Sequence, residues 1–410
     1  MKAMGNVPAD FHGVDGELVV AGQKISAIIA DAGATPLFVY DFGIVRARFA
    51  ALRAAMPTEL SLHFAMKANP LPQMVAAMAA LTDGIDVASV GEMRLAIAQG
   101  ADPAHMSFAG PGKRDAELEA AIRAGVTLNC ESAGEAERTL AIQQRIGMAA
   151  RMAVRVNPDF ELKGSGMRMG GRATAFGVDS PEVPSLVRRI VAEGADWRGF
   201  HIYGGSQALD PEAIIEMQRA TLALAARLSE EAGQAPPHLN LGGGFGIPYF
   251  PKEQPLDIAR IGAALGAQLA ARPAILAQTG FAIELGRWLV GECGVYLATV
   301  IDRKTSQGET FLVTDGGLHH QLAASGNFGT VVRRNYPLAV ASRFGAPAEE
   351  AVTVVGCLCT PLDKLGDQIE LPRADVGDVI AVFMAGAYGA SASPAAFLGH
   401  GPAAEILLGH

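Results

Sequence analysis

The sequence predicts an α/β fold built on a closed (β/α)8 barrel of the TIM type, together with a C-terminal β-barrel or β-sandwich domain. Three observations support this prediction. Apolar strand-like runs alternate with helix-like segments through the middle of the chain, and eight such strands can be counted. After about residue 291 the sequence becomes β-rich and has no long helical segment. Half of the 410 residues are hydrophobic, which is enough to bury a core in each domain.

The elements of the barrel follow one another in a regular order. A helix is expected at about residues 42–56, before the first strand. The strands are predicted at residues 60–67, 84–89, 106–110, 127–132, 151–157, 197–205, 238–244 and 281–286. Amphipathic segments between them, such as PQMVAAMAAL and RDAELEAAIRAG, predict the intervening helices. Because eight strands close this type of barrel, a barrel fits the count better than an open doubly wound sheet.

The β domain is predicted from four segments, GVYLATVIDRKT, QGETFLVTDGG, EEAVTVVGCLCT and DVIAVFM. Near the N-terminus, GELVVAGQKISAI is typical of a hairpin that joins the same domain. We therefore assign residues 37–290 to the barrel, and residues 1–36 and 291–410 to the β domain.

Composition excludes several classes of partner. The net charge of -9, without any basic run, argues against nucleic acid and anionic membranes. The longest stretch free of Asp, Glu, Lys and Arg, residues 379–404, is interrupted by Gly, Ser and Pro and is not a membrane span. The first residues contain no apolar leader, so a cytoplasmic location is expected. Four cysteines are too few for a disulfide framework, and Cys357-x-Cys359 lacks a second Cys or His pair nearby, so no metal site is expected.

Functional groups in such barrels gather at the carboxyl ends of the strands. Lys67 ends the first strand in the apolar segment LHFAMKANP. Desolvation favours the neutral amine, which is a nucleophile suited to Schiff-base chemistry. A lysine that merely extends its amine to solvent is an equally good interpretation of this segment alone.

A glycine run, Gly242-Gly243-Gly244-Phe245-Gly246, follows the seventh strand directly. Glycines let backbone N–H groups approach a phosphate closely, although a plain tight turn explains the run about as well. Glu284 ends the eighth strand, where a carboxylate needs a cation. The sixth strand leads into Tyr203, whose aromatic ring, taken singly, is more often part of a core than a cofactor platform. It then reaches Ser206, whose hydroxyl is able to hold phosphate. A lysine, an aromatic ring, a glycine cradle and an acid together match the needs of pyridoxal 5'-phosphate.

With these residues in place, the sequence resembles the fold-type III pyridoxal-phosphate decarboxylases, which include diaminopimelate, ornithine and lysine decarboxylases, with alanine racemase as a more distant relative. The segments ELKGSGMRMGG, NLGGGFGIPYF, DGGLHHQLAASGNFG and CTPLD are similar to the diaminopimelate-decarboxylase-like enzymes of exosortase and exopolysaccharide systems. Enzymes that decarboxylate an aminoacyl group on a carrier protein are near neighbours.

The resemblance implies roles for individual residues. Lys67 would form the internal aldimine, Glu284 would pair with the pyridinium nitrogen, and Cys359 would return a proton after carbon dioxide leaves. The other cofactor contacts would be Asp86, Arg155, His201, Tyr203, Ser206, Gly243, Gly244, Gly286, Arg287 and Tyr388. Because the family brings this cysteine from the partner subunit, the resemblance also implies a homodimer with shared active sites. The alternative for Cys359 is a small buried apolar residue.

Two departures from the family pattern concern the ring and the substrate. Tyr203 stands where the family usually stacks a histidine on the cofactor ring. Thr360 follows the cysteine where the familiar amine-forming enzymes carry Asp or Glu, so a distal substrate ammonium would be unpaired. The Arg-Pro segment that holds a distal carboxylate is not recognisable after Asp315, where His319 and His320 stand instead. The expected substrate contacts are Arg333, Thr360 and Asp363.

The sequence therefore predicts decarboxylation of an amino acid at its α-carbon, with a small-molecule, modified or carrier-linked substrate. Racemisation on the same cofactor is an alternative, but it requires a base on each face of the substrate. A non-catalytic, decarboxylase-like regulator is another alternative. Retention of Lys67, Glu284 and Cys359 argues against it.

Overall fold

The computed structural model describes residues 2–160, 167–168, 173–326 and 333–410. The chain forms two compact units, which are described one at a time. A barrel unit comprises Phe49–Ile247 and Pro255–Gly286. A β-rich unit comprises Met1–Arg48, Pro248–Gln254 and Arg287–His410.

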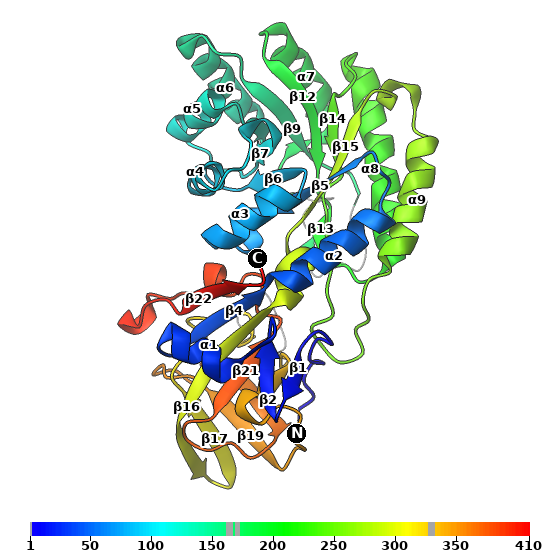
Figure 1. Ribbon diagram of the computed structural model, residues 1–410. Coiled ribbons are helices and arrows are strands. Elements are labelled where there is room, and N and C mark those ends of the chain that lie inside the picture. The colour runs from blue at the N-terminus through cyan, green and yellow to red at the C-terminus, as the bar shows by residue number, and fades with distance from the viewer. Residues whose placement is uncertain (1, 161–166, 169–172, 327–332) are drawn as a thin grey trace. The chain divides into compact units, whose positions relative to one another are not determined.

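The barrel unit is a closed ring of eight parallel strands, as predicted (Figure 1). The strands are β5 (Leu60–Ala65), β6 (Gly84–Val87), β7 (Met106–Phe108), β8 (Thr127–Cys130), β9 (Arg151–Asn157), β12 (Asp196–Ile202), β14 (His238–Asn240) and β15 (Gly280–Leu285). Each pairs with the next, and β15 pairs in parallel with β5, so the ring has no free edge. A short strand, β11 (Val178–Asp179), adds to β9 from outside the ring.

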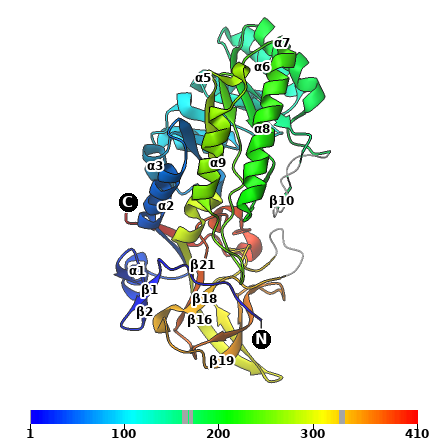
Figure 2. The same cartoon turned by 90° about the vertical axis from the view of Figure 1, so that its right-hand side faces the viewer.

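Helices follow the first seven strands of the ring in the described part of the chain. They are α3 (Pro72–Leu81), α4 (Val90–Ala98), α5 (Asp115–Ala124), α6 (Ala133–Ile146), α7 (Val183–Ala192), α8 (Pro211–Ala232) and α9 (Ile258–Ala270). Figure 2 shows α8 and α9 side by side on the outside of the barrel. Their ends carry ordinary capping residues: Ser132 accepts the Glu135 N–H at the start of α6, and Gly147 ends α6 in the left-handed region.

A buried ion pair joins two of the loops at the carboxyl ends of the strands. Lys113, just before α5, donates from Nζ to Glu135 Oε1 at 2.7 Å, and both side chains are 1% exposed. The same amine donates to the carbonyl oxygens of Gly110, at 2.7 Å, and Asn129, at 3.0 Å. All three donors of the ammonium are therefore used, which holds the loops after β7 and β8 together.

Replacing Lys113 with methionine should lower the free energy of unfolding by about 3–5 kcal/mol, because Glu135 would be left as an uncompensated buried charge. Chemical denaturation measures this change. Arg114→Met is the matched control: its side chain is 81% exposed, so stability should change little. Equal effects of the two substitutions would contradict the importance of the buried pair.

The β-rich unit is built on a mainly antiparallel sheet, as the sequence predicts. Its main path runs through β18 (Leu338–Val340), β21 (Val379–Phe383), β16 (Gly294–Ser306), β17 (Glu309–Thr314), β19 (Glu350–Val355) and β20 (Lys364–Leu371). At its side, β4 (Leu37–Asp41) pairs antiparallel with β16 and parallel with β22 (Ala404–Leu408). Residues from both ends of the chain thus complete this sheet.

One strand differs from the expected division at residue 37. Residues 37–41 were expected in the barrel, but β4 pairs with β16 and β22 in the β-rich unit. Four consecutive residues of β4, Leu37 to Tyr40, are buried there, so both faces of the strand are covered. The helix expected at residues 42–56 is α2 (Phe42–Ala55).

The N-terminal hairpin is confirmed in part. The strands β1 (His12–Val14), β2 (Glu17–Val20) and β3 (Gln23–Lys24) form a small antiparallel sheet. The turn between β2 and β3 uses Ala21 and Gly22, both with positive φ, as a two-residue hairpin requires. The following residues, expected to continue a strand, form α1 (Ile25–Ala32) instead. Across the described residues, no helix combines the length and the apolar character that crossing a membrane requires.

Candidate active site

Lys67 lies in a 3-10 turn, η1 (Met66–Ala68), directly after β5. Its side chain is exposed rather than desolvated, and Nζ lies 5.9 Å from the centre of the Tyr203 ring. Tyr203 follows β12, so two residues that are far apart in the sequence meet at the carboxyl ends of their strands. A reactive amine and an aromatic ring are thereby placed at one end of the barrel.

Glu284, in β15, is a buried carboxylate with partners from two neighbouring strands. His201 Nε2 lies 3.1 Å from its Oε2, and Asn240 donates to the same oxygen at 3.1 Å. Burial by itself would raise the pKa of Glu284, but the nearby charges of His201, Lys67 and Arg155 lower it to about 2. The carboxylate is therefore ionised across the physiological pH range. The sequence indicated only that a cation was needed, and missed Asn240, whose signal is an amide at the end of the seventh strand, two residues before the glycine run.

The glycine run packs against the backbone that carries this acid. A Cβ on Gly243 would lie 1.9 Å from the Glu284 carbonyl oxygen, so only glycine fits there. Gly242 donates its N–H to Asn240 Oδ1 at 2.8 Å. The next helix, α9, begins only at Ile258, so no helix dipole acts at the run. The run could therefore bind phosphate only through its backbone N–H groups, which a phosphate can approach closely because the glycines have no side chains.

Other predicted cofactor residues lie along the same strands. Gly286 directly follows β15 and lies against η1, where an added Cβ would be 2.8 Å from the Ala68 side chain. Asp86, in β6, is buried and accepts a hydrogen bond from Ser107. Arg155, in β9, donates to Glu131 at 2.8 Å. Asp86 and Arg155 thus each have a partner within the chain. The roles of these two residues toward a cofactor stay predictions.

Ser206 lies in β13 (Gly205–Ser206), which pairs with β10 (Met167–Arg168). Most of the motif ELKGSGMRMGG, namely residues 161–166 and 169–171, lies outside the described residues. The same holds for residues 327–329 of DGGLHHQLAASGNFG. Gly244 is in the left-handed region, with φ of +82°, which favours glycine.

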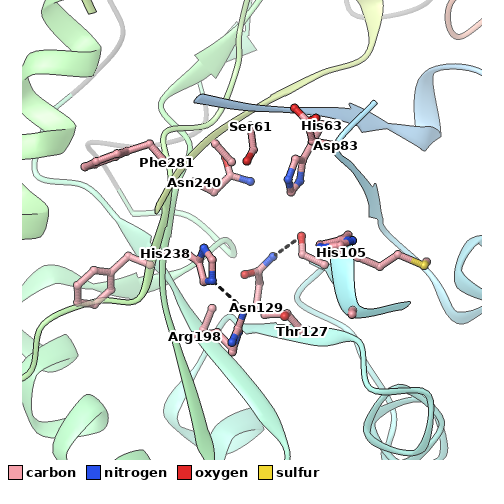
Figure 3. Close-up of a pocket in the computed structure, with 16 residues that line it drawn as sticks. Ser61, His63, Asp83, His105, Thr127, Asn129, Arg198, His238, Asn240 and Phe281 are labelled. Carbon is pink, nitrogen blue, oxygen red and sulfur yellow. Dashed lines mark hydrogen bonds between the residues drawn. The ribbon is translucent and has the colours of Figure 1, made fainter. Parts of the chain in front are cut away.

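A cavity of about 140 Å³ lies inside the barrel near the amino ends of the strands (Figure 3). Its lining includes His63, Asn129, Arg198 and His238, and Arg198 Nη2 lies 2.8 Å from His238 Nε2. Active sites of this fold lie at the opposite, carboxyl ends of the strands. The predicted site residues Lys67 and Glu284 are not among the residues that line this cavity.

In the β-rich unit, Arg287 and Tyr388 lie together, and their roles toward a cofactor stay predictions. The Arg287 guanidinium lies 4.8 Å from the centre of the Tyr388 ring and donates to the Tyr249 hydroxyl at 2.7 Å. Tyr388 has a φ of +57°, a strained conformation for a residue with a side chain. Such strain is often found at functional sites.

The loop after β19 carries the predicted acid and substrate residues, Cys359, Thr360 and Asp363. Cys359 is exposed, which does not fit the alternative of a buried apolar residue. Asp363 is buried, and its carboxylate accepts the N–H groups of Leu318, at 2.7 Å, and Leu358, at 2.8 Å. Asp363 therefore holds the loop, and its expected role toward substrate stays a prediction.

His319 and His320 lie in a turn after β17. The His320 ring has two partners, the Tyr296 hydroxyl and the Gly401 carbonyl oxygen, each at 3.0 Å. His320 is thus the structural member of the pair. Arg333 donates to the Lys364 carbonyl oxygen at 2.5 Å.

The sequence matches the family model of the pyridoxal-dependent decarboxylase, pyridoxal binding domain, over residues 42–291. The chain belongs to the pyridoxal-dependent decarboxylase family. It is 36% identical over 379 residues to an L-glutamyl-BtrI acyl-carrier protein decarboxylase of Niallia circulans, which covers 91% of this chain and 88% of the relative. It is 30% identical over 389 residues to the diaminopimelate decarboxylase of Methanothermobacter thermautotrophicus, and the match covers 92% of this chain and 87% of that protein. The crystal structure of the Helicobacter pylori diaminopimelate decarboxylase with L-lysine has a TM-score of 0.82 and 26% identity, covering 93% of this chain and 94% of that one.

These relatives confirm the predicted reaction class: the chain is a pyridoxal-phosphate-dependent amino-acid decarboxylase. The barrel residues fit the cofactor, since they offer an exposed amine, an ionised carboxylate and a backbone run without Cβ atoms. When bound, pyridoxal phosphate supplies an electron sink for the carbanion left by carbon dioxide. Lys67 would hold the aldehyde carbon, Glu284 would keep a proton on the ring nitrogen, and the glycine run would hold the phosphate. The racemase and regulator alternatives lose support, because each relative named above is a decarboxylase.

Glu284→Gln should lower kcat by about 100-fold or more, because an electrostatic contact to the group where charge develops is typically worth that much. The visible absorbance of the bound cofactor should remain, since Lys67 is unchanged. Steady-state release of carbon dioxide measures the loss. Glu137→Gln, on the surface of α6, is the control and should retain full activity. If the Glu284→Gln enzyme kept its activity, the predicted contact between Glu284 and the cofactor would be wrong.

Proposed function

We propose that this decarboxylase acts on an amino acid that is modified or attached to a carrier protein, in preference to a free diamino acid. The observation that carries the proposal is Thr360, which stands directly after Cys359 and offers no negative charge to a distal ammonium. The Niallia circulans relative, by its name, acts on a glutamyl group attached to an acyl-carrier protein. Such a substrate has no distal ammonium to pair.

No other acid of the loop replaces the missing charge. The Thr360 hydroxyl accepts the Leu362 N–H at 3.4 Å, a contact within the loop. Asp363 is buried, and both its oxygens accept backbone N–H groups of the same unit. A substrate ammonium placed beside Thr360 would therefore lose water without gaining an anion, which is unfavourable.

A basic cavity in the β-rich unit supports an anionic partner. It has a volume of about 380 Å³, and its lining includes Lys2, Lys252, Arg333 and Arg334. Lys2 pairs with Asp367, and Arg334 pairs with Glu253, so part of this charge is neutralised within the chain. Lys252 and Arg333 have no carboxylate partner among the described residues. An acidic carrier domain or its phosphate-bearing arm has the complementary charge.

The native enzyme should decarboxylate a carrier-linked glutamyl group with a kcat/KM at least about 100-fold above that for free lysine or meso-diaminopimelate, since an unpaired substrate charge costs about 3 kcal/mol. Carbon dioxide release from each substrate measures the ratio. Thr360→Glu should raise turnover of the free diamino acids, whereas the neutral Thr360→Gln should not. Efficient turnover of free meso-diaminopimelate by the native enzyme would refute the proposal.

We also propose that the enzyme is a homodimer in which Cys359 acts in the active site of the partner subunit. In the single chain Cys359 is exposed, as a residue that a second subunit covers would be. Its role would be to return a proton to the substrate carbon after carbon dioxide leaves.

Mixing equal amounts of Lys67→Ala and Cys359→Ala subunits under exchange conditions should restore activity to about a quarter of the native value, although each variant alone is inactive. Half of the dimers would then be mixed, and each mixed dimer would contain one intact site. The specific activity of the mixture, with each variant alone as control, measures the effect. Absence of recovery, with exchange shown by differently tagged subunits, would place both residues in the site of one chain.

A further inference from the structure

Three side chains from separate segments of the β-rich unit converge, and none of them is among the residues predicted to contact the cofactor. His319 lies in the turn after β17, Cys357 follows β19, and His400 follows a short 3-10 turn, η8 (Phe397–Gly399). One potential ligand atom of each lies within 4.8 Å of the other two. Cys357 Sγ is 3.9 Å from His400 Nδ1, and the His319 and His400 ring centres are 5.0 Å apart.

His319 is the member of this cluster that most needs a ligand. Its side chain has no exposed surface, and neither ring nitrogen has a hydrogen-bond partner among the described residues. A buried polar group without a partner costs about 1–3 kcal/mol. Its neighbour His320 is buried too, but both of its nitrogens have partners. The missing partners are therefore specific to His319, whose ring lies beside Cys357 and His400.

Asp363 positions two of the three segments. Its carboxylate accepts the N–H of Leu318, next to His319, and the N–H of Leu358, next to Cys357. Gly317 and Gly356 have no Cβ, and an added one would lie within 2.3 Å of an Asp363 oxygen. Each carboxylate oxygen thus supports one of these backbone segments, and the potential ligands are two imidazoles and one thiol.

We propose that His319, Cys357 and His400 bind one Zn²⁺ ion, with a fourth position open to water or another ligand. Two nitrogens and one sulfur are ligands that Zn²⁺ prefers, whereas Mg²⁺ and Ca²⁺ prefer oxygen. In a tetrahedral site the ligand atoms are about 3.5 Å apart, so small side-chain rotations would close the cluster. Binding converts the Cys357 thiol to a thiolate and releases its proton to solvent.

The site would tie the loop that carries Cys359, two residues beyond Cys357, to the C-terminal segment. The sequence by itself predicts no zinc site, because no second Cys or His pair lies near Cys357 along the chain. Here the ligands come from segments about 40 residues apart, which spacing rules for compact zinc motifs do not cover.

The test uses the full-length enzyme, stripped with a chelator and titrated with Co²⁺ and then Zn²⁺. One Co²⁺ per chain should bind with the near-ultraviolet absorbance of a cobalt–thiolate bond, and Zn²⁺ should displace it. Cys357→Ser and His400→Ala should each weaken Zn²⁺ binding more than about 100-fold, because each removes a direct ligand.

Two control variants make the test specific. Cys359→Ser changes the other thiol of the same loop, and His12→Ala changes an exposed histidine on β1; both should bind the metal as the native enzyme does. Thermal unfolding followed by circular dichroism checks that each variant is folded. A native enzyme without the cobalt–thiolate band, or a band that survives Cys357→Ser or disappears in Cys359→Ser, would overturn the proposal.

Discussion

The ionised carboxylate of Glu284 inside a closed barrel is the constraint on which the packing around it depends. A buried charge is costly unless it is paired and hydrogen-bonded. His201 and Asn240 supply those contacts from the two preceding strands of the ring. Asn240 also accepts the Gly242 N–H, so one amide links the acid to the glycine run. The acid and the cradle are therefore one structure, and a substitution in either would displace the other.

The packing of the glycine run against Glu284 explains why glycine is needed there, without reference to phosphate. Gly243 must lack a Cβ because its α-carbon lies against the Glu284 carbonyl oxygen. A tight turn and a phosphate cradle are thus not exclusive interpretations: close packing between β14 and β15 demands the glycine, and the same absence of a side chain opens the backbone to an anion. From the sequence alone the two interpretations are alternatives, because the sequence does not show that the Glu284 backbone lies opposite Gly243.

The barrel could be predicted from the sequence because its strands are short apolar runs at regular intervals, bounded by Gly, Pro and amphipathic helices. The domain to which β4 belongs is harder to predict, because Leu37 to Tyr40 is a continuous apolar run of the kind found in any buried parallel strand. Its place is decided by β16 and β22, which lie more than 250 residues away along the chain. Similarly, nothing local to Asp363 indicates that its two carboxylate oxygens accept backbone N–H groups from two separate loops.

Burial separates the four cysteines into two chemical classes. Cys130 and Cys293 lie in the core, and burial raises the pKa of the Cys130 thiol to about 12 and that of Cys293 further still, so both remain neutral and inert. Cys357 and Cys359 share one loop but face different surroundings: the first lies beside His400, and the second is exposed. A cysteine that returns a proton to a substrate must be accessible, whereas a metal ligand must be held in place by its neighbours. The loop satisfies both demands at once, because Asp363 fixes the backbone around Cys357 while leaving Cys359, two residues further on, at the surface.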